Sequence, residues 1–181
     1  SAIESAFLKS NTLHGLIVVR AGPDVMGDQH PREKLKIKLE VDTDPPGGFD
    51  TESRLVLLPV PFAVRSYSLP DLFAGKMHAV LCRKWKTRVK GRDWYDLVWY
   101  VGRHPKLRLS HLEQRMRQSG DWTERRSLTR VDLLGRLHAA ISVLDVEQAR
   151  QEVSRFVQDN ASLELWSRDF FEQISHRIET L

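Results

Sequence analysis

The chain has very little cysteine. Cys82 is the only cysteine among 181 residues, so no disulfide can form within the chain, which agrees with a reducing, cytoplasmic location. Long apolar runs are lacking as well. The longest, RLVLLPVPFAV (54–64), contains two prolines and is much shorter than the roughly 20 residues that span a bilayer. The first fifteen residues lack the features of a secretory signal. We therefore expect a soluble cytoplasmic protein with no membrane segment.

A large excess of one charge is also missing. The 28 Lys and Arg residues outnumber the 24 Asp and Glu residues only slightly, which gives a net charge of +4. The basic residues gather locally, in RKWKTRVKGR (83–92) and TERRSLTR (123–130). Such runs are more often solvated loops than binding surfaces. The hydrophobic content of 41% suffices to fill the core of a globular domain.

The hydrophobic pattern changes along the chain from strand-like to helical. Residues 2–13 predict a short amphipathic helix and 16–21 a strand; residues 34–42 alternate apolar and charged side chains, which is typical of a half-buried strand. Residues 54–69 predict one or two strands interrupted by prolines. Helices are predicted over 69–85, 92–103, 108–119, 129–142, 145–159 and 162–180. Ser68, followed by Asp71, predicts the cap of the first of these helices.

This order predicts an α+β protein rather than alternating βαβ units. We expect a small mixed or antiparallel sheet in a strand-rich part at 1–67, followed by a helical C-terminal region at 68–181.

The segment 71–100 combines apolar helical stripes with an unusual number of charges. On the first predicted helix Lys76 and Arg83 flank Ala79, whose small side chain would allow close approach of another element or a ligand.

On the next predicted helix Asp93 and Asp96 are three residues apart and lie beside the stripe expected to enter the core. Two interpretations follow. The charges form an ion-pair network that joins two helices, at roughly 0 to 1 kcal/mol per exposed pair. Alternatively they border a cleft in which cations neutralise a polyphosphate while a carboxylate orients a reacting group.

These residues also form a longer pattern. K-x-x-A-x-x-x-R (76–83), a basic loop and R-D-x-x-D-L (92–97) follow one another. The pattern resembles the fourth motif of the AbiEii/AbiGii-type toxins, nucleotidyltransferase-like proteins of the polymerase-beta superfamily. The strand KIKLEV (36–41) is similar to the family's third motif, with Lys38 and Glu40 on one face.

The resemblance implies transfer of a nucleotide from a nucleoside triphosphate to an acceptor, for which RNA is one candidate. It also implies Mg²⁺ as cofactor and a cognate antitoxin as partner. It implies the following roles: catalysis by Asp93 and Glu40, phosphate binding by Lys76, Arg83 and Lys38, support by Arg92 and Asp96, and metal binding by Glu40. Within these roles Asp93 would align Lys76 or the acceptor, and Asp96 would secure Arg92 or the helix packing.

The sequence departs from the family at its N-terminal side. Neither a Gly-Gly or Gly-Ser turn nor a metal-binding Asp-x-Asp strand is visible. Asp42 and Asp44 have the right spacing but run into Pro45-Pro46, so we interpret them as a strand end and a turn. The resemblance then implies a truncated or degenerate member, and we expect the chain alone to have little activity, because Glu40 without paired aspartates would hold magnesium poorly.

Other functions remain open at this stage. A metal-dependent nuclease is disfavoured because Lys38 precedes Glu40, the reverse of the usual order. The histidines show no paired metal-ligand spacing, and His78 and Cys82 are interpreted as ordinary helix residues. A non-catalytic module that contacts RNA or a protein is the main alternative. Its loop 84–92 would stack Trp85 on a base while neighbouring cations contact phosphates.

Overall fold

The computed structural model describes residues 3–6, 39–42, 44–58, 60–83, 89–157 and 160–181. The chain divides into two compact units, Ser1–Pro45 and Pro46–Leu181. The described strands and helices make up a mixed α+β fold, in agreement with the predicted class.

The first unit contains a short antiparallel pair of strands. β1 (Ile3–Ala6) pairs with β2 (Leu39–Asp42), with Ile3 opposite Asp42 and Ala6 opposite Leu39. The helix predicted over 2–13 is therefore wrong at residues 3–6, because pairing with a distant strand outweighs a weak local helical pattern. Residues 7–38, with the strand predicted over 16–21, lie outside the described part. Asp42 ends β2 and its Oδ1 accepts from the backbone N–H of Asp44 at 3.1 Å, as expected for a strand end and turn.

The second unit begins with a β-hairpin. β3 (Thr51–Val56) and β4 (Phe62–Tyr67) pair antiparallel from Thr51 opposite Tyr67 to Val56 opposite Phe62, which confirms the strands predicted here. At the base of the hairpin the ring of Phe49 lies 4.5 Å from that of Tyr67, edge to face. The tip carries exposed apolar side chains, namely Leu55, Leu57, Leu58, Val60 and Phe62.

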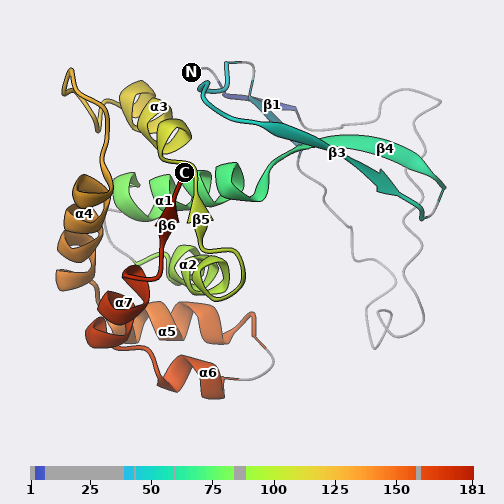
Figure 1. The fold of residues 1–181 in the computed structure, drawn as a ribbon. Coiled ribbons are helices and arrows are strands. Elements are labelled where there is room, and N and C mark those ends of the chain that lie inside the picture. The colour runs from blue at the N-terminus through green and yellow to red at the C-terminus, as the bar shows by residue number, and fades with distance from the viewer. Residues whose placement is uncertain (1–2, 7–38, 43, 59, 84–88, 158–159) are drawn as a thin grey trace, which may run out of the picture. The chain divides into compact units, whose positions relative to one another are not determined.

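Helices form the rest of the second unit (Figure 1). They are α1 (Leu69–Cys82), α2 (Gly91–Arg103), α3 (Leu109–Ser119), α4 (Arg130–Ser142), α5 (Val146–Ser154), α6 (Ala161–Glu164) and α7 (Arg168–Ser175). Two short strands, β5 (Lys106–Leu107) and β6 (Glu179–Thr180), pair in parallel. The predicted positions of the first five helices are confirmed, although α1 and α5 end earlier than expected, at Cys82 and Ser154.

The single helix predicted over 162–180 is wrong. The buried Trp166 interrupts it, and Ser167 starts a new helix because its hydroxyl accepts from the N–H of Phe170 at 3.0 Å. After α7 the chain becomes extended and joins β5 as β6. The ring of Phe171 then packs edge to face against Trp166 and Trp94, so tertiary packing decides where this segment breaks.

α1 lies at the centre of the helical unit and packs against α2, α3, α4 and β5. Its predicted apolar stripe is confirmed by Phe73 and Met77, which are fully buried. Phe73 stacks on Tyr100 of α2 with 4.7 Å between the ring centroids. α2 also packs against α5 and α7. The close packing of α1 and α2 brings their charged faces beside each other.

The start of α1 is fixed by Asp71, which is only 1% exposed. Its Oδ1 lies 2.8 Å from Nε of Arg108, and its Oδ2 accepts from the backbone N–H of Asp50 at 3.0 Å. Ser68 caps the helix by position, as predicted, but its hydroxyl donates to the Asp71 carboxylate at 2.5 Å. Asp71 therefore ties α1 to the base of the hairpin and to the start of α3.

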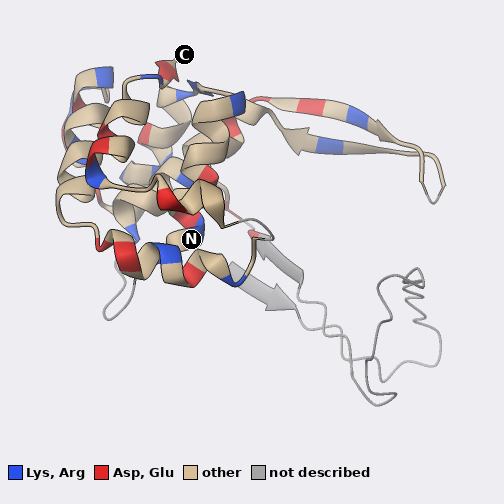
Figure 2. Cartoon of the chain, turned by 90° about the horizontal axis from the view of Figure 1, so that it is seen from below, with Lys and Arg blue, Asp and Glu red and all other residues tan. Residues whose placement is uncertain are grey.

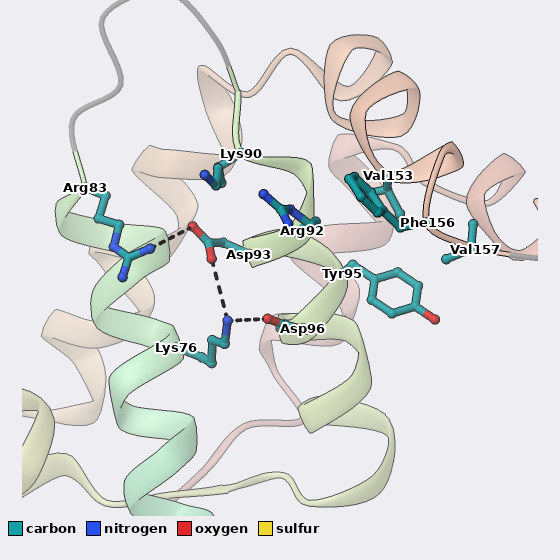
Figure 3. Close-up of a pocket in the computed structure, with 10 residues that line it drawn as sticks. All are labelled: Lys76, Arg83, Lys90, Arg92, Asp93, Tyr95, Asp96, Val153, Phe156 and Val157. Carbon is teal, nitrogen blue, oxygen red and sulfur yellow. Dashed lines mark ion pairs between the residues drawn. The ribbon is translucent and has the colours of Figure 1, made fainter. Parts of the chain in front are cut away.

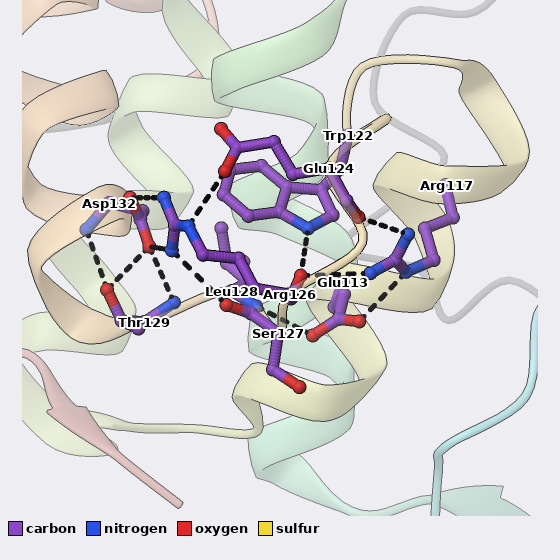
Figure 4. A network of polar contacts seen from close by, with 9 residues as sticks. All are labelled: Glu113, Arg117, Trp122, Glu124, Arg126, Ser127, Leu128, Thr129 and Asp132. Atoms are coloured by element: carbon purple, nitrogen blue, oxygen red, sulfur yellow. Dashed lines mark hydrogen bonds and ion pairs between the residues drawn. The ribbon is translucent and has the colours of Figure 1, made fainter.

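The start of α4 carries a second polar network (Figure 4). Thr129 and Asp132 form a capping box, in which the backbone N–H of Thr129 donates to Asp132 Oδ2 at 2.9 Å. Arg126 binds the same carboxylate through two nitrogens at 2.6 and 2.7 Å. The hydrogen bonds from Arg126, and then those from Thr129, hold the pKa of Asp132 well below its usual range.

An acid titration tests this network. Because the pKa of Asp132 is lower in the folded state, its contribution to stability is fully present above the unfolded pKa, roughly 4, and is lost as the pH falls further. Asp132→Asn should lower the urea midpoint at pH 7, and its difference from the parent chain should shrink progressively below about pH 4. A difference that stays constant with pH would show that the carboxylate charge is not involved.

Candidate functional site

Four charged side chains meet between α1 and α2; we refer to Lys76, Arg83, Asp93 and Asp96 as the charge cluster (Figure 3). Lys76 Nζ lies 3.8 Å from Asp93 Oδ1 and also forms an ion pair with Asp96. Arg83 Nη1 lies 3.8 Å from Asp93 Oδ2. The spacing in the sequence explains the geometry, because residues seven apart on one helix and three apart on the next return to the same face.

Asp93 is the buried member of the charge cluster. Its side chain is 7% exposed, whereas those of Lys76 and Arg83 are 39% and 55% exposed. Within the described part of the chain, Asp93 Oδ2 is buried and has no hydrogen-bond donor. Buried acceptors are normally satisfied, because leaving one unpaired costs about 1 to 3 kcal/mol. The charge cluster thus holds one buried carboxylate between two cations whose side chains reach solvent.

A cavity of about 410 Å³ adjoins the charge cluster. Besides the four cluster residues it is lined by Lys90, Arg92, Tyr95, Val153, Phe156 and Val157. Four cations and two carboxylates therefore surround it, which favours an anionic ligand. The opposite wall is apolar and aromatic, and the Arg92 guanidinium lies 4.8 Å from the centroid of the Phe156 ring (Figure 3).

A second cavity of about 340 Å³ shares Arg83, Lys90 and Asp93 with the first. The rest of its lining is apolar: Ala79, Val80, Leu81, Val89, Trp94, Ala140, Val143 and Leu144. Ala79, predicted to permit a close approach beside the cations, lines this cavity. Asp93 therefore borders two cavities, one surrounded by charge and one largely apolar.

α5 fixes the segment that leads into α2. Gln148 Oε1 accepts from the backbone N–H of Val89 at 2.6 Å, and Glu152 accepts from the backbone N–H of Gly91. Gly91 also lies so close to α5 that an added Cβ would be 2.1 Å from the carbonyl oxygen of Ala149. These contacts set the position at which Arg92 and Asp93 enter the site.

The structure brings some of the predicted site residues together. Lys76, Arg83, Arg92, Asp93 and Asp96 all line the larger cavity. Asp96 forms an ion pair with Lys76 of α1, and Arg92 lies over the ring of Phe156. The contact of Asp96 that the structure shows therefore joins α2 to α1. The role of Asp96 in the site stays a prediction.

The two predicted strand residues, Lys38 and Glu40, belong to the first unit of the chain. Glu40 lies on β2 opposite Ser5, in the other unit, and only its backbone is described. Lys38 lies outside the described residues. Their roles in catalysis, phosphate binding and metal binding therefore stay predictions.

Sequence reasoning did not find the cavity wall formed by Tyr95, Val153, Phe156 and Val157. It also did not find the anchoring side chains Gln148 and Glu152. Gln148 and Glu152 lie about sixty residues beyond their partners Val89 and Gly91, and no local pattern relates such distant segments. One signal was present in the sequence, since Phe156 is an aromatic residue that directly follows the largely polar segment 146–155.

Comparison with known families identifies the family of the chain. Residues 16–177 match the family described as nucleotidyl transferase AbiEii toxin, Type IV TA system. The match covers most of the chain, so the chain belongs to this family of nucleotidyltransferase toxins, as the motif at 76–97 predicted. No curated protein and no solved structure matched the chain. Among the described helices, none has the length and apolar character needed to cross a membrane.

Proposed function

We propose that the cavity beside the charge cluster binds the triphosphate of a nucleoside triphosphate, as part of a nucleotidyltransferase site in this toxin. The observation that carries the proposal is the lining of the cavity, in which four cations face two carboxylates. Lys76 and Arg83 are partly exposed, so their cationic ends are accessible to a ligand. An exposed ion-pair network alone would contribute little to stability.

The chemistry suits these residues. In nucleotidyl transfer an acceptor oxygen attacks the α-phosphorus, and the departing pyrophosphate takes the negative charge. Enzymes of this kind act mainly by positioning and by compensating charge. Lys76 and Arg83 would bind phosphate oxygens, and Asp93, held between them, would keep both cations in place or accept a hydrogen bond from the acceptor. Asp96 would hold Lys76 until a phosphate replaces it.

The apolar wall extends the proposal to the rest of the nucleotide. Tyr95 and Phe156 lie on the side of the cavity away from Lys76 and Arg83 (Figure 3). Nucleobases stack readily on aromatic rings because both surfaces are flat and weakly polar. A nucleotide with its phosphates at α1 would place its sugar and base towards this wall. The preferred base and the acceptor, for which RNA is one candidate, stay predictions.

The family typically uses a divalent metal ion. The residues around the cavity do not fit such an ion well, because both oxygens of Asp93 already lie 3.8 Å from a cation and Asp96 pairs with Lys76. Magnesium is usually held by carboxylates together with substrate phosphates and water. Glu40 is the metal ligand that the resemblance implies, and its side chain lies outside the description. We therefore assign phosphate binding to this cavity, and we assign no metal ion to its side chains.

Direct binding tests the proposal. The chain should bind nucleoside triphosphates in equilibrium dialysis, bind the corresponding nucleosides much more weakly, and lose affinity as salt is raised, because the contacts are ionic. Binding does not depend on turnover, so the test is informative even if the chain alone has little transferase activity. Equal affinity for nucleoside and triphosphate would contradict phosphate recognition at this site.

The alternative, a module that contacts RNA, depends on loop residues that lie mostly outside the description, namely Lys84, Trp85, Lys86 and Arg88. Figure 2 shows basic and acidic residues interspersed along the helices rather than segregated. If the module interpretation holds, removing the loop cations should abolish RNA binding while Lys76→Ala leaves it unchanged.

The family also implies a cognate antitoxin as partner, and we propose one on that ground alone.

A further inference from the structure

A second cluster of reactive side chains lies at the C-terminal end of α1. His78 and Cys82 are four residues apart on this helix, and Asp121 follows the end of α3. One ligand atom from each of the three lies within 4.8 Å of the others. All three residues are partly buried. We propose that His78, Cys82 and Asp121 form a binding site for Zn²⁺ that joins the last turn of α1 to the end of α3.

The backbone places Asp121 for this role. Gly120 adopts the left-handed conformation with φ of 80°, which ends α3 and reverses the chain. The N–H of Asp121 then donates to the carbonyl of Met116 at 2.8 Å. Asp121 is thereby held against the end of its own helix, and α3 packs along α1.

A hydroxyl already connects two of the ligands. Ser119 Oγ donates to Asp121 Oδ2 at 2.6 Å and lies 2.9 Å from His78 Nε2. The arrangement resembles the outer hydrogen bonds that orient ligands at metal sites. Zinc bonds of about 2.0 to 2.3 Å require the ligand atoms to come roughly 1 Å closer than their widest separation here. We infer that rotations of these side chains supply this change.

Charge and ligand chemistry also favour the ion. The neutral imidazole of a histidine is a common zinc ligand. A thiolate and a carboxylate together balance the two charges of Zn²⁺. The mixed nitrogen, sulfur and oxygen set suits zinc better than magnesium or calcium, which prefer oxygen ligands alone. Three protein ligands leave a fourth position for water.

The site has a bearing on the charge cluster, because Cys82 precedes Arg83 directly in the sequence. Zinc bound here would fix the last turn of α1, from which Arg83 extends towards Asp93. The histidine spacing in the sequence did not reveal this site, since its third member is about forty residues away from the other two.

Cobalt is the probe, since Co²⁺ takes tetrahedral zinc sites and a bound thiolate produces charge-transfer absorption in the near ultraviolet. One equivalent of Co²⁺ should give this absorption in the untagged chain, and one equivalent of Zn²⁺ should remove it. Cys82→Ser should lose the absorption, and His78→Ala and Asp121→Asn should weaken Co²⁺ binding by about tenfold or more. His104→Ala, outside the cluster, should bind as the parent does.

A second measurement needs no variant. Because Cys82 is the only cysteine, the rate at which the chain reacts with a thiol reagent reports this site alone. Stoichiometric Zn²⁺ should slow the reaction strongly, and a chelator should restore it. An unchanged thiol rate with Zn²⁺ present, or a cobalt spectrum unaffected by Cys82→Ser in a variant that folds normally, would overturn the proposal.

Discussion

Replacing Lys76 with alanine is expected to weaken the binding of a nucleoside triphosphate about 10- to 100-fold, because a hydrogen bond to a charged group contributes roughly 1.5 to 3 kcal/mol and each 1.4 kcal/mol is tenfold. Lys76 is 39% exposed in its side chain and faces the cavity, so its loss removes a phosphate contact directly. Isothermal titration at fixed salt measures the change.

Two variants make the result specific. Lys106→Ala removes an exposed lysine on β5 that does not line the cavity, and it should leave the affinity unchanged. Asp96→Asn removes a carboxylate that competes with phosphate for Lys76, so it should preserve or raise the affinity. If Lys76→Ala and Lys106→Ala behave alike, the charge cluster only joins two helices and the proposed phosphate site is wrong.

Gly91→Ala should destabilise the protein by about 3 kcal/mol or more, at or beyond the upper end of typical overpacking costs. An added Cβ would lie 2.1 Å from the Ala149 carbonyl oxygen and 2.9 Å from Val153 Cγ2, so α2 and α5 must separate. The separation also strains the bond from the Gly91 N–H to Glu152. Because Val153 lines the cavity, triphosphate binding should weaken as well.

Gly102→Ala is the matched control, since Gly102 lies on the same helix and an added Cβ there meets nothing within 4 Å. Alanine favours helices over glycine by about 1 kcal/mol, so this variant should be as stable as the parent or slightly more stable. Urea unfolding followed by circular dichroism compares the two. Equal midpoints for the two variants would show that the close approach of α2 and α5 is not required.

The sequence allowed the fold to be predicted where local patterns decide it. The apolar stripes of 69–85 and 92–103 became α1 and α2, since helical periodicity and burial agree there. The prediction for segment 162–180 failed because Phe171 packs against both Trp166 and Trp94, and Trp94 lies nearly eighty residues earlier. Residues 3–6 failed because their pairing partner lies at 39–42.

The candidate site shows the same division. The spacing of Lys76, Arg83, Asp93 and Asp96 predicted that their charges would meet, because the helices that carry them are adjacent in the chain. The wall at Phe156 and the ligand set completed by Asp121 depend on how distant helices pack. Periodicity within one segment carries no information about such contacts.

The most direct test of the central claim is a crystal structure of the chain with a non-hydrolysable nucleoside triphosphate. We predict phosphate oxygens within hydrogen-bond distance of Lys76 Nζ and of the Arg83 guanidinium, with the ion pair between Lys76 and Asp96 opened and the base towards Phe156. A nucleotide bound elsewhere, with the charge cluster unchanged and its cavity empty of phosphate, would contradict the account.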